Sequence, residues 1–175
     1  YHRTAAPEGE RFLHEPRPDL GGLSYQQHLN GLPDDDARLR FEMAGKHAET
    51  VADMLAWPWG DPRAHELRYE ALIADRDGAL FDAALAHWGL NAAERAEGRR
   101  VFLANSLFAG LKAPAARKGR VAGHVASGRA ERWRTEMPRA LGRAYAARFG
   151  AALKTLGYAR DDSWVETLPE TVPAA

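Results

Sequence analysis

The sequence predicts a predominantly α-helical chain with one or a few short strands. Apolar residues recur at helical spacing in several stretches, and clusters of Gly and Pro separate those stretches. The run His65–Glu70 is typical of one short strand. A lone strand forms no sheet. Either this run pairs with residues absent from the chain, or the strand prediction is wrong.

Composition predicts a soluble globular protein. A length of 175 residues suits one domain or a large piece of one. The absence of Cys excludes disulfides, thiolate zinc sites and a cysteine nucleophile. No apolar run approaches the ~20 residues that span a bilayer, and no export signal is visible. We therefore expect a cytoplasmic protein without membrane contact. The chain begins with Tyr1 rather than Met, which indicates trimming or missing upstream residues.

The first third of the chain is expected to contain an irregular segment and one helix. Residues 1–33 are interrupted by Gly21-Gly22, by Asn30-Gly31 and by Pro16, Pro18 and Pro33, so we expect them to be irregular. Asp34–Asp36 then open a helix that runs to about Trp57. Acidic residues suit a helix N-terminus. Consecutive carboxylates point in different directions, which favours capping over a metal site.

Three further helices are expected downstream. The first covers residues 78–88 and ends at Gly89, a typical glycine after a helix. Asn91 caps the second, which runs to about Ser106. Pro138 suits the first position of the last helix, which stops at Gly157. Residues 109–128 read as a loop, and residues 165–175 as a flexible tail with little apolar surface.

The zero net charge conceals a polarity along the chain. Residues 1–100 carry 18 acidic and 12 basic groups, whereas residues 101–175 carry 6 acidic and 12 basic groups. Residues 112–148 alone hold ten basic and two acidic residues. Such a segment either attracts a phosphorylated molecule, a polyanion or an acidic surface, or is a solvated face. Aromatic residues are sparse in it, so specific nucleic-acid binding is not expected.

Five motifs resemble segments of the cytosolic-type sulfotransferases, in the family's order. Arg68–Leu72, with Asp75 and a helix closing in Gly89-Leu90, is similar to the R-Y-E-D-L stretch. Asn105–Lys112 is similar to T-S-F-x-x-M-K, and His124–Arg134 to R-K-G-x-x-G-D-W-K/R. The remaining motifs are the L-x-x-L-G-Y ending, here Leu153–Tyr158, and the opening Tyr1-His2-Arg3. Together they cover most of residues 66–158.

The resemblance implies an α/β fold of the P-loop type. It implies transfer of a sulfuryl group from 3′-phosphoadenosine 5′-phosphosulfate to a hydroxyl or amine of a small-molecule or saccharide acceptor, without a metal. Residues 1–164 would form the C-terminal part of the domain, with residues 1–33 on the acceptor side. The 5′-phosphosulfate loop and the catalytic base would precede Tyr1, so no catalytic residue is assigned.

The resemblance assigns donor binding to seven residues: Tyr69, Ser106, Phe108, Ser127, Gly128, Arg129 and Trp133. Tyr69 would pack near the adenine or serve as a core aromatic. Ser106 and Phe108 would contact the base, although a buried Phe108 at a helix end is an alternative. Ser127 and Gly128 would bind the 3′-phosphate, in a segment that could equally be a surface loop. Trp133 would fix that loop by packing.

The sequence departs from the family pattern at the phosphate loop. Ala126-Ser127 stand where the family has R-K, so the main guanidinium for the 3′-phosphate is missing. Arg129, Arg132 or Lys118 would have to supply the charge. Gly123–Ala130 is also close to a Walker A loop but lacks its Lys and hydroxyl. Two alternatives stay open: a non-catalytic helical module that binds a protein or polyanion through residues 112–148, and a decayed relative that keeps only the fold.

Overall fold

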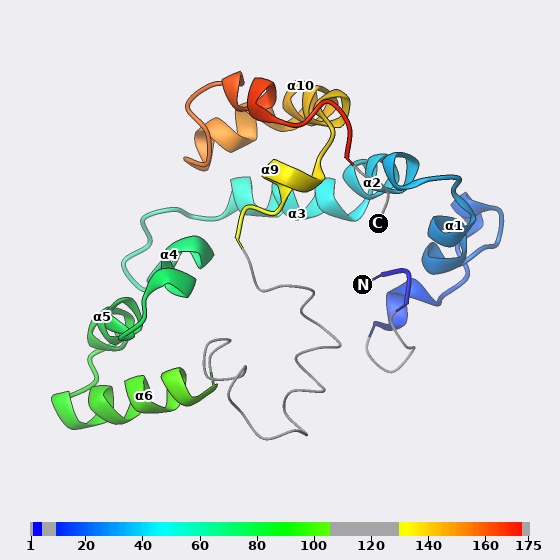
Figure 1. Cartoon of the computed structure of the whole chain (residues 1–175). Helices are drawn as coiled ribbons and strands as arrows, with labels where there is room; N and C mark the ends of the chain where they lie inside the picture. Colours follow the sequence, from blue (N-terminus) through cyan, green and yellow to red (C-terminus); the bar gives the residue numbers. More distant parts are fainter. Residues whose placement is uncertain (1, 5–9, 106–129, 173–175) are drawn as a thin grey trace. The chain divides into compact units, whose positions relative to one another are not determined.

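The computed structural model describes residues 2–4, 10–105 and 130–172 (Figure 1). These residues are predominantly helical, which confirms the prediction for this chain. Their β structure is limited to one isolated antiparallel bridge between Pro16 and Ser24. The chain divides into two compact units, residues 1–57 with 132–175, and residues 58–131. Each unit is described by itself below.

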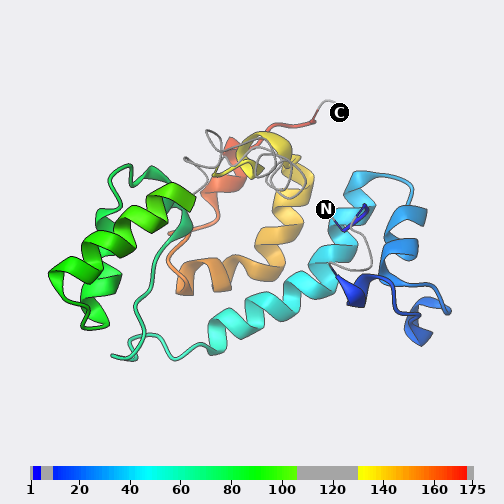
Figure 2. The ribbon, with the colours of Figure 1, turned by 90° about the horizontal axis from the view of Figure 1, so that it is seen from below.

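The first unit contains most of the described helices. They are η1 Arg11–Leu13, η2 Pro18–Leu20, α1 Tyr25–Gly31, α2 Asp35–Ala44, α3 Lys46–Ala56, α9 Trp133–Glu136, α10 Arg139–Thr155 and η3 Ser163–Thr167. The last long helix, α10, contacts α2, α3 and η3 (Figures 1 and 2). Its buried residues Leu141 and Phe149 form one core cluster with Met43 of α2 and Val51 of α3. Segments almost a hundred residues apart in sequence therefore build one core.

A capped helix occupies part of the segment that was predicted to be irregular. The Ser24 hydroxyl accepts the Gln27 N–H at 3.2 Å, and the Gln27 side chain accepts the Ser24 N–H at 2.8 Å, forming a capping box at the start of α1. Tyr25 and Leu29 of this helix pack against Leu13 in a second cluster. The prediction was wrong here because α1 spans only seven residues and ends on a glycine.

The single helix expected from Asp34 to Trp57 is two helices. The Asp34 side chain accepts the Ala37 N–H at 2.8 Å, so the predicted cap is confirmed. Gly45, however, leaves the helical conformation and separates α2 from α3. The apolar face continues across the break, since Met43 and Val51 belong to the same cluster. Periodicity alone therefore gave no sign of the interruption.

The C-terminal residues pack on α10, at least as far as Leu168, instead of forming a flexible tail. Leu168 is 1% exposed and lies against Gly142, where an added Cβ would come within 2.2 Å of its Cδ1. The Arg139 N–H donates to the Pro169 carbonyl at 2.8 Å. This segment contains few apolar residues, but two of them, Val165 and Leu168, are buried, so the prediction was wrong there.

The second unit contains α4 Tyr69–Ala74, α5 Ala79–His87 and α6 Ala92–Asn105. The short strand expected at His65–Glu70 is not formed. Residues 65–68 have no strand or helix assignment, and Arg68 is extended, but Tyr69 already begins α4. A strand needs a partner, and the described residues provide none for this segment.

Helices α5 and α6 form a packed pair, and both lie within the residue ranges predicted from the sequence. Asp75 caps α5 by accepting the N–H groups of Ala79 and Leu80 at 3.1 and 2.7 Å. Asn91 caps α6 by accepting the Glu94 N–H at 3.1 Å. The rings of Phe81 and Phe102 stack between the helices with centroids 4.3 Å apart. The Asn91 cap was predicted from the sequence, whereas Asp75 was quoted only as part of a family-like motif.

Candidate functional site

Most of the predicted donor-binding residues lie outside the described part of the chain. This applies to Ser106, Phe108, Ser127, Gly128 and Arg129, and to the substitute cation Lys118. Tyr69 and Trp133 are described, but they belong to different units. The structure therefore gives the surroundings of each of these two residues and no geometry between them.

Tyr69 is the first residue of α4, and its side chain is accessible. It is 47% exposed, so it is not a core aromatic within the described residues. The preceding Arg68 is extended, and the helix begins directly after it. Tyr69 thus presents an aromatic ring at the junction between an extended segment and a helix.

Trp133 is the first residue of α9, and it packs against other side chains of the first unit. Its ring meets Trp164 edge to face, with centroids 5.3 Å apart. The Arg134 guanidinium carbon lies 4.5 Å from the centroid of the Trp133 ring, a cation–π contact. These contacts fit the packing role that the resemblance implies for this residue.

The described arginines of the basic segment are largely paired with nearby carboxylates. Arg132 pairs with Glu136 at 2.7 Å, and Arg139 pairs with Glu170 at 2.7 Å. Arg143 pairs with Glu166 at 3.3 Å. These pairs are largely exposed, so each contributes little stability and can open for another anion. They nevertheless reduce the positive charge that this part of the segment presents.

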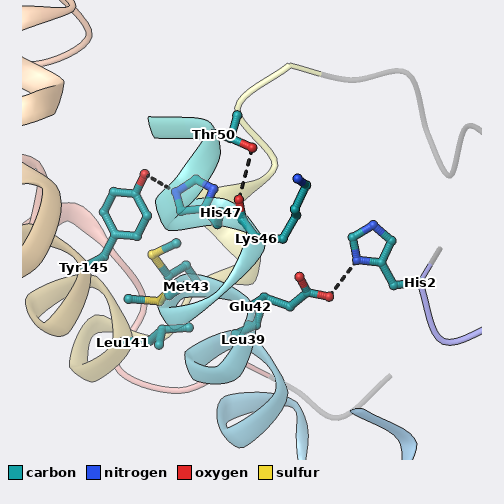
Figure 3. Close-up of a pocket in the computed structure, with 10 residues that line it drawn as sticks. His2, Leu39, Glu42, Met43, Lys46, His47, Thr50, Leu141 and Tyr145 are labelled. Atoms are coloured by element: carbon teal, nitrogen blue, oxygen red, sulfur yellow. Dashed lines mark hydrogen bonds and ion pairs between the residues drawn. The ribbon is translucent and has the colours of Figure 1, made fainter. Parts of the chain in front are cut away.

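A cavity that sequence reasoning missed lies between α2, α3 and α10 in the first unit (Figure 3). Its volume is about 460 Å³, within the range of small-molecule sites. Four apolar and six polar residues line it: Leu39, Met43, Met137 and Leu141, then His2, Glu42, Lys46, His47, Thr50 and Tyr145.

Glu42 is fixed by two hydrogen bonds on one side of this cavity. The Tyr25 hydroxyl donates to Glu42 Oε2 at 2.7 Å, and His2 Nδ1 lies 2.7 Å from Oε1. Burial, together with the Glu42 charge, raises the pKa of Tyr25, so this hydroxyl keeps its proton. Both carboxylate oxygens of Glu42 therefore already have a partner.

His47 and Tyr145 form a hydrogen-bonded pair between α3 and α10. His47 Nε2 lies 2.9 Å from the Tyr145 hydroxyl (Figure 3). The imidazole also meets the Phe149 ring edge to face. Burial lowers the pKa of His47, with Arg148 adding to this effect and Glu42 opposing it. Burial also raises the pKa of Tyr145. Both side chains are therefore uncharged near pH 7, and one proton lies in the hydrogen bond between the Tyr145 oxygen and His47 Nε2.

The cavity has one accessible cation and no metal-binding group among the described residues. Lys46 pairs with Glu49 at 3.1 Å, and both side chains are mostly exposed. Across residues 2–4, 10–105 and 130–172, no group of three or more His, Asp or Glu is placed to hold a metal ion. Within the same residues, no helix combines the length and apolar character of a membrane span.

The sequence contained little signal for this cavity. His47 and Tyr145 are 98 positions apart and meet only through the packing of α10 on α3. Comparisons with protein-family models, with curated proteins and with solved structures found no match. The functional interpretation therefore depends on the motifs and on the geometry above.

Proposed function

We propose that this chain contributes the adenosine 3′-phosphate side of the donor site in a sulfotransferase that uses 3′-phosphoadenosine 5′-phosphosulfate. The observation that carries the proposal is the set of family-like motifs in the family's order across residues 66–158. Where these motifs fall on described residues, they coincide with element boundaries. Asp75 caps α5, and Gly157 follows α10.

The surroundings of Tyr69 support a role in binding the base. In α/β folds, ligands bind beyond the carboxyl ends of strands, where a strand turns into a helix. Tyr69 is comparable in that it follows the extended Arg68 and opens α4, although residues 65–68 form no strand here. Its exposed ring offers a face on which adenine can stack.

Recognition of the 3′-phosphate would require cations and backbone N–H donors. Gly128 would offer a backbone N–H, and Ser127 a hydroxyl. Arg129, Arg132 and Lys118 are the candidate cations. Arg132 is held by Glu136 in an exposed pair four residues apart, which a phosphate dianion can displace because such pairs are weak.

The reaction in this proposal is an in-line displacement at sulfur. The acceptor oxygen or nitrogen forms the new bond to sulfur, and the bond from sulfur to the 5′-phosphate oxygen breaks. The acceptor proton passes to a general base, and adenosine 3′,5′-bisphosphate leaves. Positioning and electrostatic stabilisation provide most of the rate enhancement in such transfers. The part of this chain is to hold the nucleotide end of the donor.

Calorimetric titration with adenosine 3′,5′-bisphosphate tests the proposal on the longest translation product that contains this chain. We expect micromolar binding, weakened about fivefold or more by Tyr69→Ala, because base–aromatic stacking contributes about 1–3 kcal/mol. Trp88→Ala is the matched control, since Trp88 is another exposed aromatic of the same unit. Absence of micromolar binding would overturn the proposal.

The charge of residues 112–148 supports a second candidate, a non-catalytic module that binds a polyanion. The carboxylates that pair with Arg132, Arg139 and Arg143 weigh against it. Heparin binding that falls steeply with salt, in a protein that binds no nucleotide, would favour this candidate instead.

A further inference from the structure

We infer that the cavity between α2, α3 and α10 binds a small amphipathic carboxylate, a single anionic group on an apolar body. This inference does not rest on the proposed donor site, because every lining residue belongs to the first unit and none is a predicted donor residue. Three features of the cavity support it: the apolar wall, the hydrogen bonds that already engage both Glu42 oxygens, and the donors that Lys46 and His47 provide.

The apolar wall provides the contact surface for the body of the ligand. Leu39 and Met43 of α2 line the cavity together with Leu141 of α10 (Figure 3). Met43 and Leu141 also belong to the buried core cluster, so this wall is held in place by packing. Removing apolar ligand surface from water on such a wall favours binding at about 25 cal/mol per Å².

Hydrogen bonds already engage the acceptor oxygens at the polar end. Glu42 Oε2 accepts from the buried Tyr25 hydroxyl, and Oε1 pairs with His2. The Thr50 hydroxyl donates to the Lys46 carbonyl at 3.1 Å. The charged side chain that remains available to a ligand is Lys46, because its pair with Glu49 is exposed and easily exchanged.

His47 adds a second donor in the tautomer in which its Nε2 accepts from the Tyr145 hydroxyl. Within the described residues, His47 Nε2 is the hydrogen-bond partner of the Tyr145 hydroxyl. Burial raises the pKa of that hydroxyl, so it keeps its proton and can donate it to Nε2. A neutral imidazole that accepts at Nε2 carries its proton on Nδ1. Figure 3 shows Lys46 on the side of the imidazole opposite Tyr145. Nδ1–H therefore donates on the side where the ammonium group lies.

The two donors match the two oxygens of a carboxylate. One oxygen can accept from the Lys46 ammonium and the other from His47 Nδ1–H. The nearby negative charge of Glu42 disfavours a dianion such as a phosphate monoester, because only one unit of positive charge faces it. A monoanion with an apolar body matches the positive charge of Lys46, the two hydrogen-bond donors and the apolar wall.

Titration of the full chain with octanoate tests the inference. We expect saturable one-to-one binding, weakened about tenfold by Lys46→Met, because hydrogen bonds to charged groups contribute about 1.5–3 kcal/mol. Lys154→Met is the matched control: Lys154 also pairs with a carboxylate, Asp162 at 3.4 Å, but does not line the cavity. It should leave the affinity within about twofold. Circular dichroism checks that both variants keep their helices.

Three ligands sharpen the test. Octanol keeps the apolar chain without the charge, and octylamine reverses the charge. Octanol binding as tightly as octanoate, or octylamine binding more tightly, would overturn the inference, as would equal losses in the two lysine variants. Adenosine 3′,5′-bisphosphate should not displace octanoate. Displacement would place the cavity within the donor site and would also overturn the inference, whereas failure of nucleotide binding alone would leave it intact.

Discussion

At the scale of single residues, burial controls the chemistry of the cavity in the first unit. His47 is partly enclosed between α3 and α10, where it faces Tyr145, Phe149 and the charges of Glu42 and Arg148. Desolvation disfavours its charged form. The imidazole is consequently held neutral and hydrogen-bonded to Tyr145, and a neutral imidazole has one ring nitrogen that donates and one that accepts.

This burial predicts how stability depends on pH. The pKa of His47 is lowered in the folded chain, whereas an unfolded His titrates near about 6.5. Below that pH the unfolded chain binds more protons at this site than the folded chain does. The free energy of unfolding therefore decreases as the pH falls through about 6.5. The urea midpoint should fall less in His47→Gln than in the unaltered chain between about pH 7.5 and about pH 5.5. Equal falls would contradict this account.

A second residue-scale prediction concerns close packing at Gly142. A Cβ there would lie 2.2 Å from Leu168 Cδ1, so Gly142→Ala must displace the buried Leu168. We expect a loss of about 1–3 kcal/mol in the free energy of unfolding, typical of overpacking. Gly31→Ala is the matched control, because it also lies in a helix and nothing approaches it within 4 Å. Similar urea midpoints for the two variants would show that the C-terminal residues are not packed there.

At the scale of elements, the sequence predicts what depends on neighbouring residues. The caps Asp34 and Asn91, and the end of α5 at Gly89, were predicted because each involves residues within one or two turns. The break at Gly45 was not predicted, since the apolar face continues through it. The proximity of His47 to Tyr145 was also missed, because it arises from tertiary packing.

The capping box of α1 provides a test at this scale. Ser24 is buried and its hydroxyl accepts the Gln27 N–H. Ser24→Ala should cost about 0.5–2 kcal/mol of unfolding free energy, the usual effect of losing an N-cap. Ser163→Ala serves as the control, because Ser163 is exposed at the start of η3. A Ser24→Ala midpoint no lower than that of Ser163→Ala would contradict the importance of this cap.

At the scale of the whole molecule, the chain combines a helical framework with a strongly uneven charge. The basic residues gather in 112–148, and three of the described arginines there, Arg132, Arg139 and Arg143, pair with Glu136, Glu166 or Glu170. Five of the seven residues assigned to donor binding fall in residues 106–129, outside the described ranges. The donor site is therefore supported by motifs and by the position of Tyr69, and binding measurements address it directly.

The central claim, binding of a nucleotide 3′-phosphate, is tested most directly by comparing two ligands on the same protein. Adenosine 3′,5′-bisphosphate and adenosine 5′-monophosphate differ only in the 3′-phosphate. Calorimetry should show the bisphosphate binding at least about tenfold more tightly, because charge-assisted hydrogen bonds to the additional phosphate are among the strongest available. Equal affinities, or no binding of either nucleotide, would contradict the account.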